Sequence, residues 1–241
     1  MTRSKDDTAD CGQGLQAGNY MKIISFILDL LFPPKCVFCS KVLSTGDEGW
    51  CDRCTEGLPY TDNFGKQDGD VFDFCISPLY YTGTVRRSIL RYKFRGASYY
   101  SNTYGRVLAQ CIRELKDNDK IDAGYDVISW VPLSTKRERK RGYDQAKLLA
   151  IETAFELGEA VVETLKKVID VQPQSELGDK TERSANISGA YVISDSELIN
   201  GKRILLIDDI VTTGSTFDEC ARVLLSAGAT GVMCAALARG E

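Results

Sequence analysis

The pattern of apolar and polar positions from about residue 71 onward alternates short apolar runs with longer amphipathic ones. Short apolar runs are typical of buried strands, and apolar positions three and four apart are typical of helices. The pattern predicts strands at 75–81, 126–133, 190–193, 203–207 and 232–238, and helices at 84–94, 103–115, 143–157 and 216–227. Strands that alternate with helices favour a parallel sheet covered by helices, so the expected fold class is α/β.

The first 32 residues carry a different pattern. Residues 1–20 are polar and rich in glycine without periodicity, which predicts a disordered leader, and Met21 is a second candidate start. Residues 21–32 (MKIISFILDLLF) form an apolar run that contains Asp29 and is shorter than the ~18 residues of a membrane span. We expect a short helix that packs on the protein. The alternative is a membrane or secretory segment, but no small-x-small cleavage site follows.

The middle of the chain suggests the domain boundaries. Residues 33–60 hold paired cysteines and little apolar material, and residues 61–70 are polar and predict a linker. The expected organisation is a leader (1–20), a helix with a cysteine module (21–62) and one larger α/β domain (71–241).

Composition narrows the chemistry. The 241 residues have a net charge of −4, so no global basic field points to nucleic acid. Histidine is absent, which excludes catalytic triads, general bases and metal sites that need imidazole. Nine cysteines are an odd number, which favours a reducing, cytoplasmic location over a secreted disulfide framework.

Four of the cysteines form two close pairs, Cys36-x2-Cys39 and Cys51-x2-Cys54, separated by eleven residues. Two such knuckles can present four thiolates to Zn²⁺ in a tetrahedron. Because this segment has little apolar material, metal binding would supply its stability. A redox-active thiol pair is the alternative, but it needs one pair at a helix start rather than two in tandem. We therefore expect a structural zinc site.

The sequence ILLIDDIVTTGST (204–216) carries the strongest signal in the chain. A buried strand leads into Asp208 and Asp209, and a loop of small residues then opens a helix. Ligands bind beyond the carboxyl ends of strands in open α/β sheets, and helix N-termini attract phosphate. The expected phosphate-binding residues are Thr212, Thr213, Gly214, Ser215 and Thr216. A sugar with two hydroxyls and a bound Mg²⁺ would satisfy the two acids, whereas the alternative is that they only cap the helix.

Three basic or polar segments could face the same site. The run at 136–141 (KRERKR) is a solvated surface, a nucleic-acid patch or a set of phosphate contacts. Lys93 and Arg95 follow the helix at 84–94 and either complement its dipole or bind phosphate. Residues 170–189 form a long polar loop, either a simple exposed loop or a lid. The candidate residues of that lid are Gln174, Ser175, Arg183 and Asn186.

Together these segments resemble the ComF/GntX family of phosphoribosyltransferase-like proteins over about residues 21–239. The resemblance rests on PPKCVFC…CDRC, YYTGTVRRSILRYKFRG, VPLSTKRERKRGYDQAKLLA, QPQSELGDKTERSANISGAY and ILLIDDIVTTGST. It implies a type I phosphoribosyltransferase fold, a Rossmann-like parallel sheet with a small N-terminal zinc-ribbon module. In that family the motif at 204–216 binds 5-phosphoribosyl-1-pyrophosphate (PRPP), with the acids on the ribose hydroxyls. Further residues implied near the cleft are Lys93, Arg95, Arg137, Arg141, Arg183 and Asn186.

One position departs from the family pattern. A strand before the basic run often ends in a histidine there, in a pattern like VPVPLH, whereas this chain has Ser134. Serine is no equivalent base, so the role of that histidine does not carry over.

The resemblance implies two functions. The first is an enzyme that transfers phosphoribosyl from PRPP, with Mg²⁺, to an unidentified nitrogenous acceptor and releases pyrophosphate. The second is a binding module that senses PRPP or a nucleotide and serves DNA uptake through single-stranded DNA or competence-protein contacts. The tyrosines that could stack on a base, or serve only in packing, are Tyr99, Tyr100, Tyr104 and Tyr143.

Overall fold

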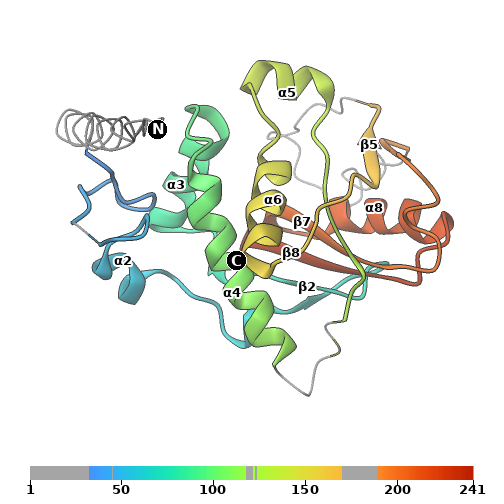
Figure 1. Ribbon diagram of the computed structural model, residues 1–241, viewed down its shortest axis with the longest axis horizontal. Helices are drawn as coiled ribbons and strands as arrows, with labels where there is room; N and C mark the ends of the chain where they lie inside the picture. The colour runs from blue at the N-terminus through green and yellow to red at the C-terminus, as the bar shows by residue number, and fades with distance from the viewer. Residues whose placement is uncertain (1–32, 45, 118–121, 123, 170–188, 241) are drawn as a thin grey trace, which may run out of the picture.

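A parallel sheet forms the centre of the protein (Figure 1). The structure is a computed structural model that describes residues 33–44, 46–117, 122, 124–169 and 189–240. Its strands lie in the order β1-β2-β8-β7-β4, with β3 also paired to β8, and all pairs except β1–β2 are parallel. The strands are β1 (Gln67–Asp68), β2 (Phe74–Ile76), β3 (Leu79–Tyr80), β4 (Val127–Trp130), β7 (Arg203–Val211) and β8 (Gly231–Arg239). The α/β fold class is thus confirmed.

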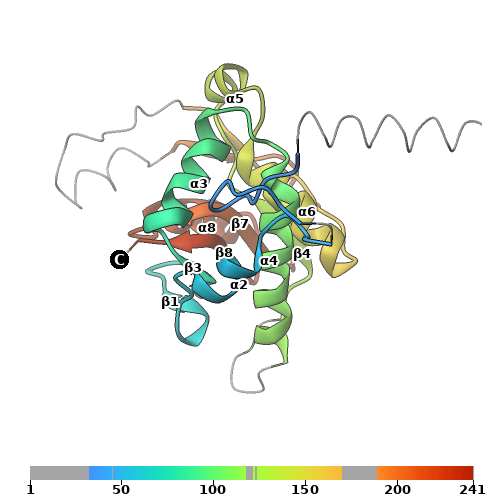
Figure 2. The same cartoon turned by 90° about the vertical axis from the view of Figure 1, so that its left-hand side faces the viewer.

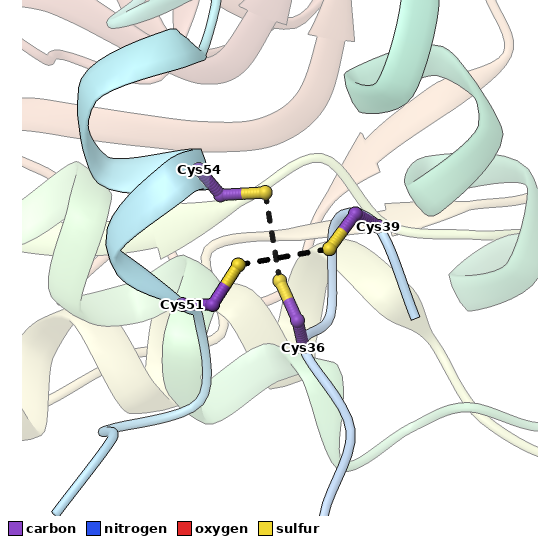
Figure 3. Close-up of side chains that lie close together, drawn as sticks. All are labelled: Cys36, Cys39, Cys51 and Cys54. Atoms are coloured by element: carbon purple, nitrogen blue, oxygen red, sulfur yellow. Dashed lines mark hydrogen bonds between the residues drawn. The ribbon is translucent and has the colours of Figure 1, made fainter. Parts of the chain in front are cut away.

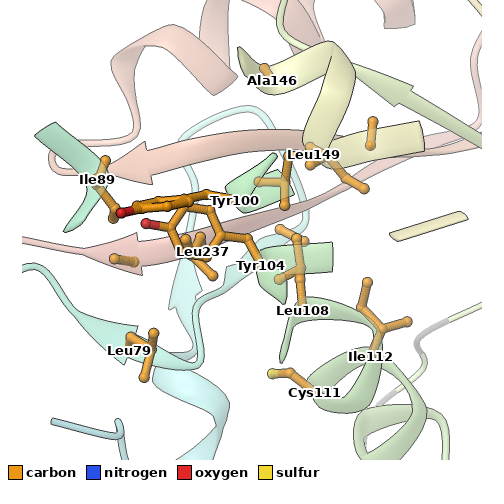
Figure 4. Close-up of a cluster of buried hydrophobic side chains, with 14 of the residues drawn as sticks. Leu79, Ile89, Tyr100, Tyr104, Leu108, Cys111, Ile112, Ala146, Leu149 and Leu237 are labelled. Atoms are coloured by element: carbon orange, nitrogen blue, oxygen red, sulfur yellow. The ribbon is translucent and has the colours of Figure 1, made fainter. Parts of the chain in front are cut away.

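Helices cover both faces of this sheet (Figures 1 and 2). One face packs against α3 (Gly83–Phe94), α4 (Tyr100–Lys116) and α6 (Gln145–Leu157) through strand residues such as Leu205 and Ile207. Figure 4 shows Tyr100, Tyr104 and Leu149 meeting in that core. The other face packs against α8 (Ser215–Ser226) through Ile204 and Leu206. Successive residues of β7 therefore serve opposite layers.

Strand β7 is longer than the sequence predicts. The apolar run suggests an end at Ile207, but the ladder to β8 continues, and Ile210 and Val211 pair with Ala238 and Arg239. Backbone pairing with β8 supplies the hydrogen bonds that side-chain polarity alone does not reveal. Asp208 and Asp209 consequently lie within the strand rather than beyond it.

Two expectations about residues 61–81 change in the structure. The single strand predicted at 75–81 is two strands, β2 and β3, because Pro78 has no N–H for the ladder. The predicted linker at 61–70 carries η1 (Asn63–Gly65) and the edge strand β1. This connection therefore belongs to the sheet edge.

The basic run forms a helix, α5 (Thr135–Arg141), that the apolar pattern did not predict because none of its residues is buried. Ser134 caps its start by accepting a hydrogen bond from Arg137 N at 3.4 Å, and Gly142 ends it with a φ of 90°. Asp144 then caps α6 through Ala146 N at 3.0 Å and Lys147 N at 3.1 Å.

The predicted strand at 190–193 exists but lies outside the central sheet. It is β6 (Tyr191–Ile193), which pairs antiparallel with β5 (Leu165–Lys167) in a separate two-stranded sheet. The lid residues Gln174, Ser175, Arg183 and Asn186 fall outside the described residues, as do the segments 1–20 and 21–32. Among the described helices, none combines the length and the apolar character that a bilayer crossing requires.

Candidate functional site

Four cysteine side chains converge at the N-terminal end of the described chain (Figure 3). Cys36 and Cys39 come from one turn, and Cys51 and Cys54 lie at the start of α2 (Asp52–Gly57). All four Sγ atoms lie within 4.8 Å of one another, with Cys36 to Cys54 at 3.6 Å and Cys39 to Cys51 at 3.7 Å. Zn–S bonds of about 2.3 Å in a tetrahedron require sulfur atoms about 3.8 Å apart, so the cluster fits zinc.

Within the cluster, the thiolate form is favoured at Cys36, whereas burial raises the pKa of the Cys39 and Cys54 thiols. Burial raises the pKa of the Cys36 thiol, but hydrogen bonds from the backbone of Cys39 and Cys51 outweigh it and lower the pKa to about 7. Zinc binds thiolates rather than thiols. Because the protein supplies all four ligands, no coordination position is left for a substrate, and the site is structural.

Asp208 and Asp209 point to opposite faces of the sheet, as expected for neighbouring residues within a strand. Beyond the effect of burial, the charge of Asp208 raises the pKa of Tyr191 on the α8 side. Likewise after burial, the charge of Asp209 raises the pKa of Tyr92 on the α3 side. The two acids therefore lie on opposite faces of β7 rather than side by side.

Asp209 is the more enclosed acid, with 2% of its surface exposed. Its Oδ1 atom forms an ion pair with Lys93 Nζ of α3 at 2.9 Å. Its Oδ2 atom is buried and finds no hydrogen-bond partner among the described residues. An unsatisfied buried carboxylate oxygen is costly, so this atom favours a ligand that donates a hydrogen bond.

Asp208 is half-buried, and its Oδ1 atom accepts a hydrogen bond from the backbone N–H of Asp209 at 2.7 Å. Burial, and next the charge of Asp209, raise the pKa of Asp208 well above its usual range, although Lys93 partly opposes this. A nearby cation would reverse that effect by stabilising the ionised form.

The predicted phosphate loop (residues 212–216, called the phosphate loop below) begins directly after β7. Gly214 has a φ of 80° and starts α8, and a Cβ atom on it would lie 3.2 Å from the ring of Phe72. Thr213 Oγ1 and Ser215 Oγ lie 2.8 Å apart, and Ser215 N donates to Thr213 Oγ1 at 3.4 Å. The loop thus gathers hydroxyls with the first backbone N–H groups of α8, a suitable environment for phosphate.

A cationic cavity of about 470 Å³ lies between the end of α3 and α5. Its lining residues are Lys93, Phe94, Gly96, Arg137, Lys140 and Arg141. The last three share one face of α5, because their spacing matches a helical turn. The basic run therefore presents one face to a cavity, and Lys93 joins that cavity to Asp209.

Other expected residues lie elsewhere. Arg95 follows α3 and is exposed, and it is not among the residues that line the cavity. Tyr100 and Tyr104 are buried in the core and therefore serve in packing, whereas Tyr99 is exposed and Tyr143 is half-buried.

Sequence reasoning included Lys140 only as part of the basic run at 136–141 and did not single out Lys140 or Phe94 as residues that line the cavity. The Arg141 guanidinium lies 5.4 Å from the centre of the Phe94 ring. The spacing of the cations along α5 was the signal that could have identified Lys140.

Two family models match the chain. Residues 139–241 match the phosphoribosyl transferase domain, and residues 27–73 match the double zinc ribbon domain. The second match contains all four clustered cysteines.

Several curated bacterial proteins are similar over most of their length. DNA utilization protein YhgH of Salmonella typhimurium is 30% identical, over 87% of this chain and 99% of that protein. Competence protein F of Haemophilus influenzae is 26% identical, over 85% of this chain and 96% of that protein. Competence protein ComFC of Bacillus subtilis is 28% identical, over 61% of this chain and 56% of that protein.

Among solved structures, glutamine PRPP amidotransferase from B. subtilis has a TM-score of 0.37 and 22% identity, over 57% of this chain and 26% of that one. The fold class is carried by the domain models, the parallel sheet and the cysteine cluster. The chain therefore belongs to the ComF family, with a phosphoribosyltransferase-type α/β domain and an N-terminal zinc ribbon.

Proposed function

We propose that this protein binds PRPP together with Mg²⁺ and transfers the phosphoribosyl group to a nitrogenous acceptor. The observation that carries the proposal is the buried Asp209 carboxylate directly before the phosphate loop. One of its oxygens is paired with Lys93 and the other finds no partner among the described residues. A ribose hydroxyl supplies the hydrogen bond that this second oxygen lacks.

The charges around Asp209 suit a ligand with an anion at each end. The 5′-phosphate binds at the N-terminus of α8, where Thr213 and Ser215 add their hydroxyls. The ribose lies against Asp208 and Asp209. The pyrophosphate lies toward the cavity, where arginine and lysine side chains offset its charge.

In the proposed transfer, the acids and the cations have different roles. Asp208 is the residue that would hold Mg²⁺, because its raised pKa would fall beside a cation, and the ion would neutralise charge on the pyrophosphate. The bond between ribose C1 and the pyrophosphate oxygen breaks, and its electron pair leaves with the pyrophosphate. The acceptor nitrogen forms the new bond to C1 and loses its proton to solvent. Lys93, Arg137 and Arg141 stabilise the charge that develops on the leaving group.

A second candidate is a sensor that binds PRPP and releases it intact while the protein serves DNA uptake. The names of the similar proteins, competence protein and DNA utilization protein, favour this second function. The cations of α5 would then contact single-stranded DNA or a competence protein. In either role we propose a cytoplasmic location, which suits a cluster of zinc-binding thiolates.

A thermal-shift titration with PRPP and Mg²⁺ tests the binding site. PRPP at 100 times its dissociation constant stabilises the native state by about 2.7 kcal/mol. We expect this shift in the wild type and in Asp117→Asn, an exposed control at the end of α4, but not in Asp209→Asn. Equal shifts in all three proteins would remove Asp209 from the site.

A pyrophosphate-release assay separates the two functions. An enzyme releases pyrophosphate when nucleobases and other nitrogenous acceptors are supplied, whereas a sensor binds PRPP without turnover. DNA binding is measured alongside, because phosphate contacts predict an affinity that falls steeply with salt. DNA binding without any response to PRPP would contradict both candidates as stated.

A further inference from the structure

The turn that carries Cys36 and Cys39, called the knuckle below, is hydrogen-bonded directly to α3, the helix that carries Lys93. The carbonyl oxygens of Val37 and Phe38, between the first two zinc ligands, accept hydrogen bonds from Arg91 Nη2 at 2.7 and 2.8 Å. The Ser88 hydroxyl donates to the Val37 carbonyl as well. Ser88 and Arg91 of α3 can therefore make these hydrogen bonds only while the knuckle, residues 36–39, keeps its backbone conformation.

A chain of tilted and edge-on aromatic contacts forms a second connection. Phe38 packs on Tyr104 with ring centres 5.8 Å apart, and Tyr104 meets Tyr92 edge-on at 5.3 Å. Tyr92 in turn packs on Tyr143 at 5.7 Å. Phe38, Tyr92 and Tyr104 are almost completely buried, and Figure 4 shows Tyr104 deep in the core beside Leu108.

Both connections end at the walls of the cationic cavity. Tyr92 precedes Lys93, and its hydroxyl donates to the Gln145 carbonyl at 2.7 Å. The Gln145 side chain accepts a hydrogen bond from Arg141, which lines the opposite wall. The Tyr143 hydroxyl donates to the Tyr92 carbonyl and so joins the segment after α5 to α3.

The phosphate loop lies in a different environment. It packs on Phe72 and opens α8, and the apolar cluster around α8 includes none of the described knuckle residues. Cys36 and Phe38 belong instead to the cluster of α3, α4 and α6. The knuckle therefore shares its apolar cluster with the helices beside the cavity and not with the phosphate loop.

We infer that zinc occupancy sets the anion affinity of the cavity between α3 and α5, through the positioning residues Arg91, Phe38, Tyr104 and Tyr92. Knuckles of this kind fold only with their metal, so zinc loss releases the carbonyls that hold Arg91 and the ring of Phe38. Lys93 and Arg141 then lose their fixed separation, and binding of a polyanion must again order them. The inference rests on the proposed role of the cavity in binding pyrophosphate.

The test compares zinc-loaded and chelator-treated protein with inorganic pyrophosphate as the probe. Calorimetry is expected to show binding at least tenfold weaker without zinc, about 1.4 kcal/mol. Hydrogen exchange gives a readout that needs no ligand. Exchange is expected to rise in residues 92–97 and 135–142 while α8 stays protected. An equal rise in α8 would overturn the inference, because zinc would then support the whole fold.

Variants test the two connections with zinc in place. Phe38→Leu interrupts the ring contacts, and Arg91→Lys keeps the charge but cannot hold both carbonyls in the same way. Both are expected to weaken pyrophosphate binding and to raise exchange in residues 135–142. Phe155→Leu, at a side chain that is 75% exposed, is the matched control and should change neither.

The outcomes separate the inference from the proposed function. Pyrophosphate binding and exchange that are both unchanged by zinc loss would overturn the inference and leave the proposed function standing. Zinc-loaded wild type that fails to bind pyrophosphate would overturn the proposed role of the cavity and this inference with it, whatever the exchange data show.

Discussion

Replacing Lys93 by methionine removes one half of a buried ion pair. The Asp209 carboxylate has only 2% of its surface exposed and lies 2.9 Å from Lys93 Nζ, whereas the lysine side chain is 20% exposed. Breaking a buried pair typically costs about 3–5 kcal/mol, because the remaining charge stays buried without compensation. Since water reaches Lys93, we expect the lower end, about 3 kcal/mol. Removing the acid instead, in Asp209→Asn, should cost less, because the freed lysine can turn toward solvent.

Urea unfolding of zinc-loaded protein at neutral pH measures the effect. We expect the double variant Lys93→Met/Asp209→Asn to be more stable than Lys93→Met alone, so that the mutant cycle gives a coupling energy of about 1–3 kcal/mol. The control Lys166→Met, in an exposed pair with Glu163 at 3.8 Å, should change the free energy of unfolding by less than about 0.5 kcal/mol. A Lys93→Met protein within that same margin of wild type would refute the reasoning.

Three further predictions concern the acid, the metal and the loop. Because the pKa of Asp208 is raised in the folded state, its ionised form destabilises the protein at high pH. Asp208→Asn should therefore raise the melting temperature at roughly neutral pH. This gain should vanish below about pH 4, where the carboxyl of the unfolded chain is protonated too. A gain that does not depend on pH would contradict the raised pKa of Asp208. Cys51→Ser should bind less than one zinc per chain and melt at a lower temperature, as measured by metal analysis and thermal unfolding, and full zinc retention would argue against the four-thiolate site. Gly214→Ala should lower stability by about 1–3 kcal/mol in urea unfolding and abolish PRPP binding, because a φ of 80° and the Phe72 ring at 3.2 Å both oppose a side chain. The matched control Gly158→Ala has a φ of 73° but meets no described atom within 4 Å, so it should cost less and leave binding intact.

The elements of the central domain were predictable where an apolar pattern marks them. Helices at 84–94 and 216–227 and the strand at 232–238 match α3, α8 and β8 to within one or two residues at each end. Helix α5 was not predictable in this way, because a helix without a buried face has no apolar period. Strand β5 carries two lysines among its three residues and was hidden for the same reason.

The sequence by itself indicated two candidate binding sites, the segment 204–216 and the four paired cysteines. Residues 204–216 place two acids, a loop of small residues and a helix start within thirteen consecutive positions, and the spacing of four cysteines favours their convergence. Their chemistry could therefore be inferred without any knowledge of the rest of the chain.

Only the tertiary structure decided which other residues lie against the segment 204–216 and the cysteine cluster. Lys93 meets Asp209 across the α3 face of the sheet, and Arg91 meets the zinc knuckle. The opposite directions of Asp208 and Asp209 follow from strand pairing with β8, which continues beyond the apolar run. Contacts between residues far apart in sequence depend on how whole layers pack, and no local pattern of polarity encodes that packing.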